Sequence, residues 1–154
     1  MIGKIRKFRK LSPKERALFM EAYYMLGMVR AAILRVSFKR LTRSLAHQAK
    51  KGELEPLTEE QKQTALEIGR AIQRAAAYTP WESACLAQSL TAQKMLQKRG
   101  IPGVFYLGAA KDKGGEEMIK AHAWSQCGDQ IITGGGGHKN YAVLSVFGWK
   151  AKVS

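Results

Sequence analysis

The hydropathy pattern of the chain changes once, at the stop signals Gly100 and Pro102. Before these residues, apolar side chains recur every three to four residues, which is the spacing of amphipathic helices. After them, short apolar runs are separated by turn residues, which is typical of strands. Helices followed by an antiparallel sheet define the α+β class. The length of 154 residues, 45% of them hydrophobic, is sufficient for one continuous core.

The first helix is expected to begin at Ser12. The Ser12 hydroxyl can cap the first free amides, and Pro13 suits the first helical position. Glu15 completes an S-x-x-E capping box. The basic tract 39–51 is expected to continue or restart this helix and to end at Gly52.

Two further helices and four strands are expected. The second helix starts at Thr58, with Gln61 completing another capping box. The third runs from about Glu82 to Arg99. The four strands are expected at 104–110, 118–126, 130–133 and 141–147. A tight turn at 127–129 joins the second strand to the third.

Positive charge is concentrated in the N-terminal third of the chain. Residues 1–51 contain 14 Lys or Arg against two Glu, which accounts for +12 of the net charge of +14. Such a region can contact nucleic acid, an anionic membrane or an acidic peptide, or it can be a solvated helix face. We therefore expect a mobile basic arm at 1–11, a basic helical region at 12–55, and the core domain at 56–154.

The remaining composition restricts the setting of the protein. No run of about 18 apolar residues is present, so no transmembrane segment is expected. The N-terminus lacks the pattern of a secretory signal, which makes a cytoplasmic location the default. Two cysteines without a C-x-x-C motif indicate neither a disulfide framework nor a zinc finger.

Cys85 is the candidate nucleophile. It falls in the first turn of the third expected helix, whether Thr79 or Ser83 caps that helix. Unpaired amides and the helix dipole favour a thiolate there. The same amides can stabilise an oxyanion on a carbonyl that the sulfur attacks.

His122 is the candidate base. It lies in an expected strand, whereas His47 lies in the basic tract and His138 in a glycine loop. Alternation places His122 and Trp124 on the same face of that strand. A helix carrying Cys85 on this face would bring thiol and imidazole together. A buried structural cysteine and a hydrogen-bonded histidine remain the alternatives.

Other motifs give weaker indications. The tract 134–137 is four glycines, but no Gly-Lys-Ser/Thr follows, so a flexible loop beside the site is favoured over a phosphate loop. Zinc ligation is disfavoured because the spacings match no zinc pattern; the residues considered were Cys85, His122, Cys127 and His138. Trp81 and Trp124 can line a substrate groove or simply pack in the core.

Three segments carry a specific resemblance: 81–90 (WESACLAQSL), 98–101 (KRGI) and 121–124 (AHAW). They resemble the transglutaminase-like cysteine peptidases and, more narrowly, the peptidase half of the split leader peptidases of lasso-peptide biosynthesis. The resemblance covers about residues 56–148. It implies a papain-like or transglutaminase-like core with a nucleophile helix packed on an antiparallel sheet, with Cys85 as nucleophile and His122 as general base and acid.

The third catalytic member departs from the family, which is expected to place an acid on the strand after the His-Ala-Trp strand. If the hairpin is centred on residue 128, position 134 lies opposite His122, and this position is Gly134. Asp129 lies in the turn, about 20 Å along the strand from His122, and is not assigned. Thr133, a backbone carbonyl or water can instead hold the ring.

The resemblance implies acyl transfer on a ribosomal precursor peptide, with removal of the leader from the core. It also implies leader recognition by a small companion protein and later ring closure by a separate ATP-using lasso cyclase, with no cofactor or metal in this chain. One alternative is a transglutaminase or amidase reaction on the same fold. The other is a non-catalytic basic module binding nucleic acid or membrane; no nucleic-acid partner is expected, because exposed aromatics are not interleaved with the basic residues.

Overall fold

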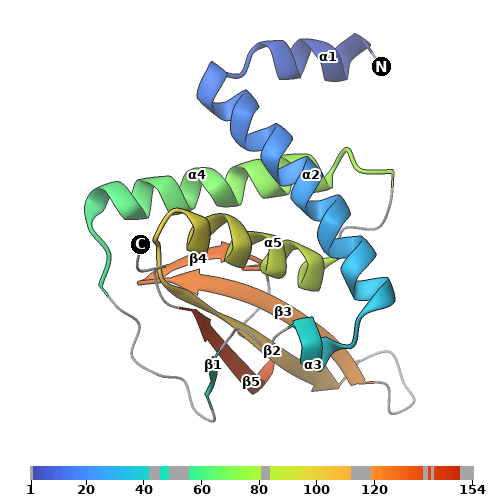
Figure 1. Cartoon of the computed structure of the whole chain (residues 1–154), viewed down its shortest axis with the longest axis vertical. Coiled ribbons are helices and arrows are strands. Elements are labelled where there is room, and N and C mark those ends of the chain that lie inside the picture. The colour runs from blue at the N-terminus through green and yellow to red at the C-terminus, as the bar shows by residue number, and fades with distance from the viewer. Residues whose placement is uncertain are drawn as a thin grey trace.

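A layer of helices covers one face of an antiparallel sheet (Figure 1). The computed structural model describes residues 2–41, 46–48, 56–80, 84–111, 119–136, 139 and 141–149. The helices are α1 (Ile2–Arg9), α2 (Pro13–Arg35), α3 (Phe38–Leu41), α4 (Glu59–Ala76) and α5 (Cys85–Lys98). The strands are β1 (Ala46–Gln48), β2 (Gly103–Lys111), β3 (Ile119–Cys127), β4 (Gln130–Thr133) and β5 (Ala142–Trp149). They form a five-stranded sheet in the order β1-β5-β2-β3-β4.

Ser12 and Thr58 both act as helix N-caps, and at Thr58 the full capping box is formed. The Ser12 hydroxyl accepts a hydrogen bond from the Glu15 amide at 3.1 Å, and α2 begins at the next residue. Thr58 accepts from the Gln61 amide at 3.1 Å, while the Gln61 side chain accepts from the Thr58 amide at 3.0 Å. These starts of α2 and α4 confirm the sequence predictions.

The third helix begins at Cys85, later than expected. Its N-cap is Ala84, which provides no side-chain hydrogen bond. Residues 81–83, including the expected cap Ser83, lie outside the described residues. Cys85 is therefore the first helical residue of α5, within the turn that the sequence predicted.

Among its described residues, the basic tract after α2 is helical only at its beginning. α2 ends where the amide of Val36 donates a hydrogen bond to the carbonyl of Ala32, and α3 is a single helical turn. Residues 46–48 form β1, which pairs antiparallel with β5 and places His47 opposite Phe147. The helical prediction is confirmed for residues 39–41 and wrong for residues 46–48, because an unpaired sheet edge offers backbone partners that local sequence does not reveal. Residues 42–45 and 49–52 of the predicted helix lie outside the described residues. The four other strands agree with prediction to within two residues.

The main core lies between α2, α4, α5 and the sheet. Phe105 and Phe147 stack there with ring centroids 4.9 Å apart. Alternation along β2 places Val104 and Tyr106 on the opposite face, where they form a smaller cluster with Trp124 and Val146. The sheet is thus apolar on both faces, and α5 covers only one of them.

The N-terminal residues pack into the same unit as the core. α2 contributes Leu18, Ala22, Leu26 and Val29 to the buried cluster. The expected boundary at residue 56 therefore does not separate two hydrophobic cores. Within the arm expected at 1–11, α1 is helical and Phe8 contacts Phe19 edge to face at 5.3 Å.

α2 is long and apolar enough to cross a membrane, judged only by its length and composition. In this fold one side of α2 packs against α4 and α5. The helix therefore serves the core of the domain, and its composition alone does not indicate a span.

Candidate active site

The thiol of Cys85 lies beside the backbone of β3. The Ala123 amide donates a hydrogen bond to Cys85 Sγ at 3.4 Å. β4 ends opposite Ser125, at Thr133, so its pairing with β3 does not extend to Ala123. The start of α5 is thereby fixed at the edge of β3, one residue after His122.

The first amides of α5 are suited to bind a negative charge. The first intrahelical bond runs from the Gln88 amide to the Ala84 carbonyl, so the amides of residues 85–87 are not used by the helix. Ala84 supplies no side-chain cap. A carbonyl attacked by Cys85 would place its developing oxyanion near these donors.

The imidazole of His122 is held by a backbone carbonyl. Its Nε2 atom lies 2.6 Å from the carbonyl oxygen of Gly134. Because a carbonyl can only accept, Nε2 carries the hydrogen, which leaves a lone pair on Nδ1 in the neutral ring. Trp124 stacks on the ring at 5.7 Å and Tyr141 contacts it at 4.9 Å. The ring therefore has a set tautomer with Nδ1 available as a base.

Gly134 is needed for this contact. Its φ of +71° favours glycine, and a Cβ there would clash with the Ala123 carbonyl oxygen and lie 3.0 Å from Trp124 Cβ. The hairpin differs from the predicted register: Cys127 pairs with Gln130, and a bulge shifts the pairing between Ser125 and Gln126. Pairing ends at Thr133, and the Gly134 carbonyl still reaches the imidazole.

Thr133 has a different set of partners. Its hydroxyl is buried and lies 2.6 Å from Ser125 Oγ and 3.1 Å from Ser89 Oγ. This hydroxyl cluster, Ser89–Thr133–Ser125, joins α5, β3 and β4. Among the described residues Thr133 makes no hydrogen bond to His122, so the structure does not bring the third predicted member to the ring.

α5 packs on the other face of β3 from the one expected. Ser125 and Cys127 face the helices, while Trp124 belongs to the cluster on the opposite side. The prediction that α5 covers the His122 and Trp124 face was therefore wrong. Cys85 instead approaches β3 at its edge, and within the described part of the chain its thiol makes no hydrogen bond to the imidazole.

The other predicted residues are distributed as follows. Trp124 is 4% exposed and stacks on Tyr106 at 5.4 Å, so it packs more than it lines an open groove. Asp129 is exposed in the turn before β4, away from the imidazole. Trp81 and His138 lie outside the described residues.

Cys127 is a structural cysteine. It is completely buried among the core side chains, and this burial raises the pKa of its thiol to about 12. It therefore remains a neutral thiol at physiological pH. Within the part of the chain that the structure describes, no three His, Cys, Asp or Glu side chains are grouped to hold a metal ion.

Sequence reasoning missed Tyr141 and the Ala123 amide as parts of the site. A signal for Tyr141 was available in Gly108, which lies opposite His122 on β2. A Cβ on Gly108 would come within 2.9 Å of Tyr141 Cβ and of the Trp124 ring. A glycine inside a strand often marks such a close approach.

The family comparison agrees with this arrangement. The family model of the transglutaminase-like superfamily matches residues 27–146, from within α2 to within β5, and so includes both Cys85 and His122. Folds of this superfamily commonly belong to cysteine peptidases or acyltransferases. No curated protein and no solved structure matches the chain. The match covers most of the sequence and the α+β architecture fits it, so the chain belongs to the transglutaminase-like superfamily.

Proposed function

We propose that this protein is a cysteine peptidase that removes the leader from a ribosomal lasso-peptide precursor, with Cys85 as nucleophile and His122 as general base and acid. The observation that carries the proposal is the position of the Cys85 thiol. It lies on the first residue of α5 and at the edge of the strand that bears His122.

The reaction begins with transfer of the thiol proton of Cys85 to His122 Nδ1. The thiolate attacks the carbonyl carbon that joins leader and core, and the α5 amides stabilise the oxyanion. The C–N bond then breaks as His122 gives its proton to the departing core amine. This leaves the leader as a thioester on Cys85.

Water completes the cycle. His122 takes a proton from the water molecule that attacks the thioester, and the C–S bond breaks to release the leader carboxylate and to regenerate the thiol. The Gly134 carbonyl stabilises the imidazolium formed in each half-reaction, because its oxygen faces the Nε2–H bond.

The proposed partners follow from the resemblance of residues 56–148 to the split leader peptidases of lasso-peptide biosynthesis. A small recognition protein presents the leader to this chain, and a separate cyclase then joins the freed core amine to an acidic side chain of the core. We place these steps in the cytoplasm. Cleavage by this chain would precede macrolactam formation, because the cyclase needs the new amine.

An acyl transfer to an amine is the second candidate, because the superfamily includes acyltransferases. It would use the same Cys85 thioester. The two reactions differ in the group that accepts the acyl unit, which is water in one and an amine in the other.

The test is mass spectrometry of a leader–core precursor incubated with this protein in ¹⁸O-labelled water, with and without the recognition protein. Cys85→Ala and His122→Ala test the site, and Cys127→Ala is the matched control for loss of a thiol. Peptidase activity predicts a free core and a leader that carries one ¹⁸O atom. It also predicts loss of both products in the two site variants only.

Other results separate the alternatives. A leader joined to an added amine, without ¹⁸O, would favour the acyltransferase. An intact precursor in the presence of the recognition protein would contradict both reactions on this substrate.

A further inference from the structure

The solvent side of α2 is apolar along almost its whole length. Its large exposed side chains are Met20 (56% exposed), Tyr24 (65%), Met28 (53%) and Leu34 (68%). Ala17 and Ala31 are also exposed and lie on the same side. We call the six residues Ala17, Met20, Tyr24, Met28, Ala31 and Leu34 the outer face of α2. Monomeric proteins rarely leave such a continuous apolar stripe in contact with water.

The opposite side of α2 is already used by the core. Leu18, Ala22, Leu26 and Val29 are at most 7% exposed and face α4 and α5. α2 is therefore apolar on both sides. Helices of this kind are normally covered on all sides by protein or lipid.

Positive charge surrounds the outer face. Residues 2–41 contain eleven Lys or Arg and only two acids, Glu15 and Glu21. Each acid is paired with a cation of another helix: Glu15 lies 3.6 Å from Arg74, and Glu21 contacts Lys98 and Arg99. The face therefore has no unneutralised acid beside it among the described residues of α2.

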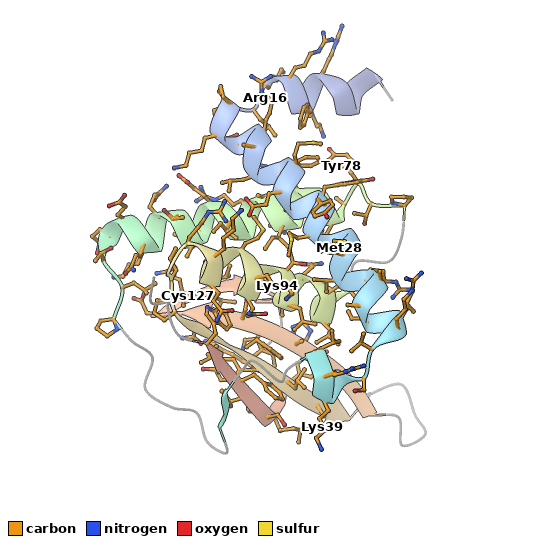
Figure 2. The ribbon with its side chains drawn as sticks, viewed as in Figure 1. Arg16, Met28, Lys39, Tyr78, Lys94 and Cys127 are labelled. Atoms are coloured by element: carbon orange, nitrogen blue, oxygen red, sulfur yellow. The ribbon has the colours of Figure 1, made fainter. Side chains whose placement is uncertain are left out.

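The exposed cations lie at both ends of the outer face. Arg6, Lys7, Arg9 and Lys10 are at the α1 end, where Phe8 fixes α1 against α2 through Phe19. Arg35, Lys39 and Arg40 are at the other end. Figure 2 shows Met28 midway along α2, with Arg16 towards α1 and Lys39 beyond the far end.

From this arrangement we infer that the outer face of α2 and its two basic ends form a docking surface for an anionic lipid membrane. An apolar helix face bordered by Lys and Arg is the pattern of helices that lie in the membrane interface. The cations would contact the phosphates of the headgroups, and the outer face would enter the boundary between headgroups and acyl chains.

α2 would lie along the membrane surface and would not cross it. To span a membrane, α2 would have to separate from α4 and α5. This separation would uncover buried side chains of the core, such as Leu26 and Val29. The proposal is independent of the catalytic assignment, since it uses neither Cys85 nor His122.

The test is co-sedimentation of the full chain with vesicles of phosphatidylcholine alone, or of phosphatidylcholine with phosphatidylglycerol, in 0.15 M salt. The variant Met20→Gln/Met28→Gln/Leu34→Gln removes apolar groups from the outer face and retains every charge. Leu144→Gln is the matched control, because Leu144 is 70% exposed but lies on β5. The melting temperature of each variant checks that it is folded.

We expect the wild-type chain and Leu144→Gln to bind the anionic vesicles equally well, and the triple variant to bind about tenfold more weakly. Lys7→Glu/Arg9→Glu/Lys39→Glu should also weaken binding, whereas Lys62→Glu on α4 should not. Wild-type binding by the triple variant would overturn the proposal, because charge alone would then explain binding. If the wild-type chain did not bind anionic vesicles, the membrane proposal would also be overturned. If the triple variant lost only its contact with the recognition protein, the outer face of α2 would be assigned to a protein partner instead.

Discussion

His122 Nε2 lies 2.6 Å from the carbonyl oxygen of Gly134, so a main-chain group, one of the alternatives left open by the sequence, holds the imidazole where the family is expected to place a side-chain acid. A carbonyl orients the ring and fixes its tautomer, but it stabilises the imidazolium less than the full negative charge of a carboxylate would. No substitution of a side chain can remove this acceptor. Its position depends instead on the backbone conformation of Gly134.

Gly134→Ala should therefore impair catalysis without changing any catalytic side chain. The left-handed backbone costs about 1–2 kcal/mol for a residue with a Cβ. The new Cβ would also clash with the Ala123 carbonyl oxygen. We expect kcat/KM for precursor cleavage to fall by about 10- to 100-fold, because the imidazole loses its orientation.

Two other glycines provide matched controls for this variant. Gly100 has a φ of +73° with no atom near its added Cβ, so Gly100→Ala reproduces the backbone cost away from the site. Gly136 also has open space and lies in the same glycine tract. Both variants should retain activity per folded molecule. Equal activities for Gly134→Ala and Gly100→Ala would mean that the carbonyl contact does not orient His122.

The two cysteines should react very differently with an alkylating reagent. Cys85 is half-buried at the start of α5, whereas Cys127 is inaccessible and burial raises its pKa to about 12. Iodoacetamide at neutral pH should modify Cys85 alone in the native protein. Peptide mapping by mass spectrometry measures this, and Cys85→Ala should remain unmodified until urea unfolds it. A native adduct on Cys127 would contradict the structure.

The features that the sequence predicted best are those set by neighbouring residues. The N-cap hydrogen bonds of Ser12 and Thr58 join residues three positions apart, so the starts of α2 and α4 could be predicted. Cys85 was also predicted to lie in the first turn of its helix, although the N-cap is Ala84 and neither Thr79 nor Ser83. The strand pattern after Pro102 also depends on local alternation and turns.

The features that were missed depend on contacts between distant segments. β1 exists because residues 46–48 pair with β5, about 100 residues later. The face of β3 that α5 covers is decided by the packing of Ser89 and Cys127, which alternation alone does not fix. The bulge in β4 shifts its pairing with β3, and the four residues of that strand do not predict this shift, although Gly134 still reaches His122.

Thr133 should contribute to stability and not to the chemical step. Its hydroxyl links Ser89 and Ser125, so Thr133→Val would leave two buried hydroxyl groups without this partner. We expect a loss of about 1–3 kcal/mol in the free energy of unfolding, measured in urea. Activity per folded molecule should be close to that of the wild type.

Thr91 offers a control for that substitution. It is completely buried on α5, and its hydroxyl oxygen has no hydrogen-bond partner among the described residues. Thr91→Val removes a buried hydroxyl that makes no compensating hydrogen bond among the described residues, so the free energy of unfolding should be unchanged or higher. Equal destabilisation by Thr91→Val and Thr133→Val would show that the hydroxyl cluster adds no stability. A selective loss of turnover in folded Thr133→Val would instead restore Thr133 as a positioning residue for His122.

Glu21 should make the stability of the fold depend on pH in the acidic range. The hydrogen bond from Arg99, aided by Lys98, lowers the pKa of Glu21 from 4.5, although partial burial acts in the opposite direction. A lowered pKa in the folded state means that the stabilisation is complete well above pH 4.5 and is lost as the pH falls through the folded value. At neutral pH this stabilisation should amount to about 1 kcal/mol, because the pair is partly exposed to solvent.

The free energy of unfolding in urea, measured at pH 7 and at pH 3, should differ less between the two pH values for Glu21→Gln than for the wild type. Glu60→Gln, at an exposed position on α4, should behave as the wild type does. An unchanged pH dependence in Glu21→Gln would mean that the contact between α2 and the end of α5 does not stabilise the fold through this charge.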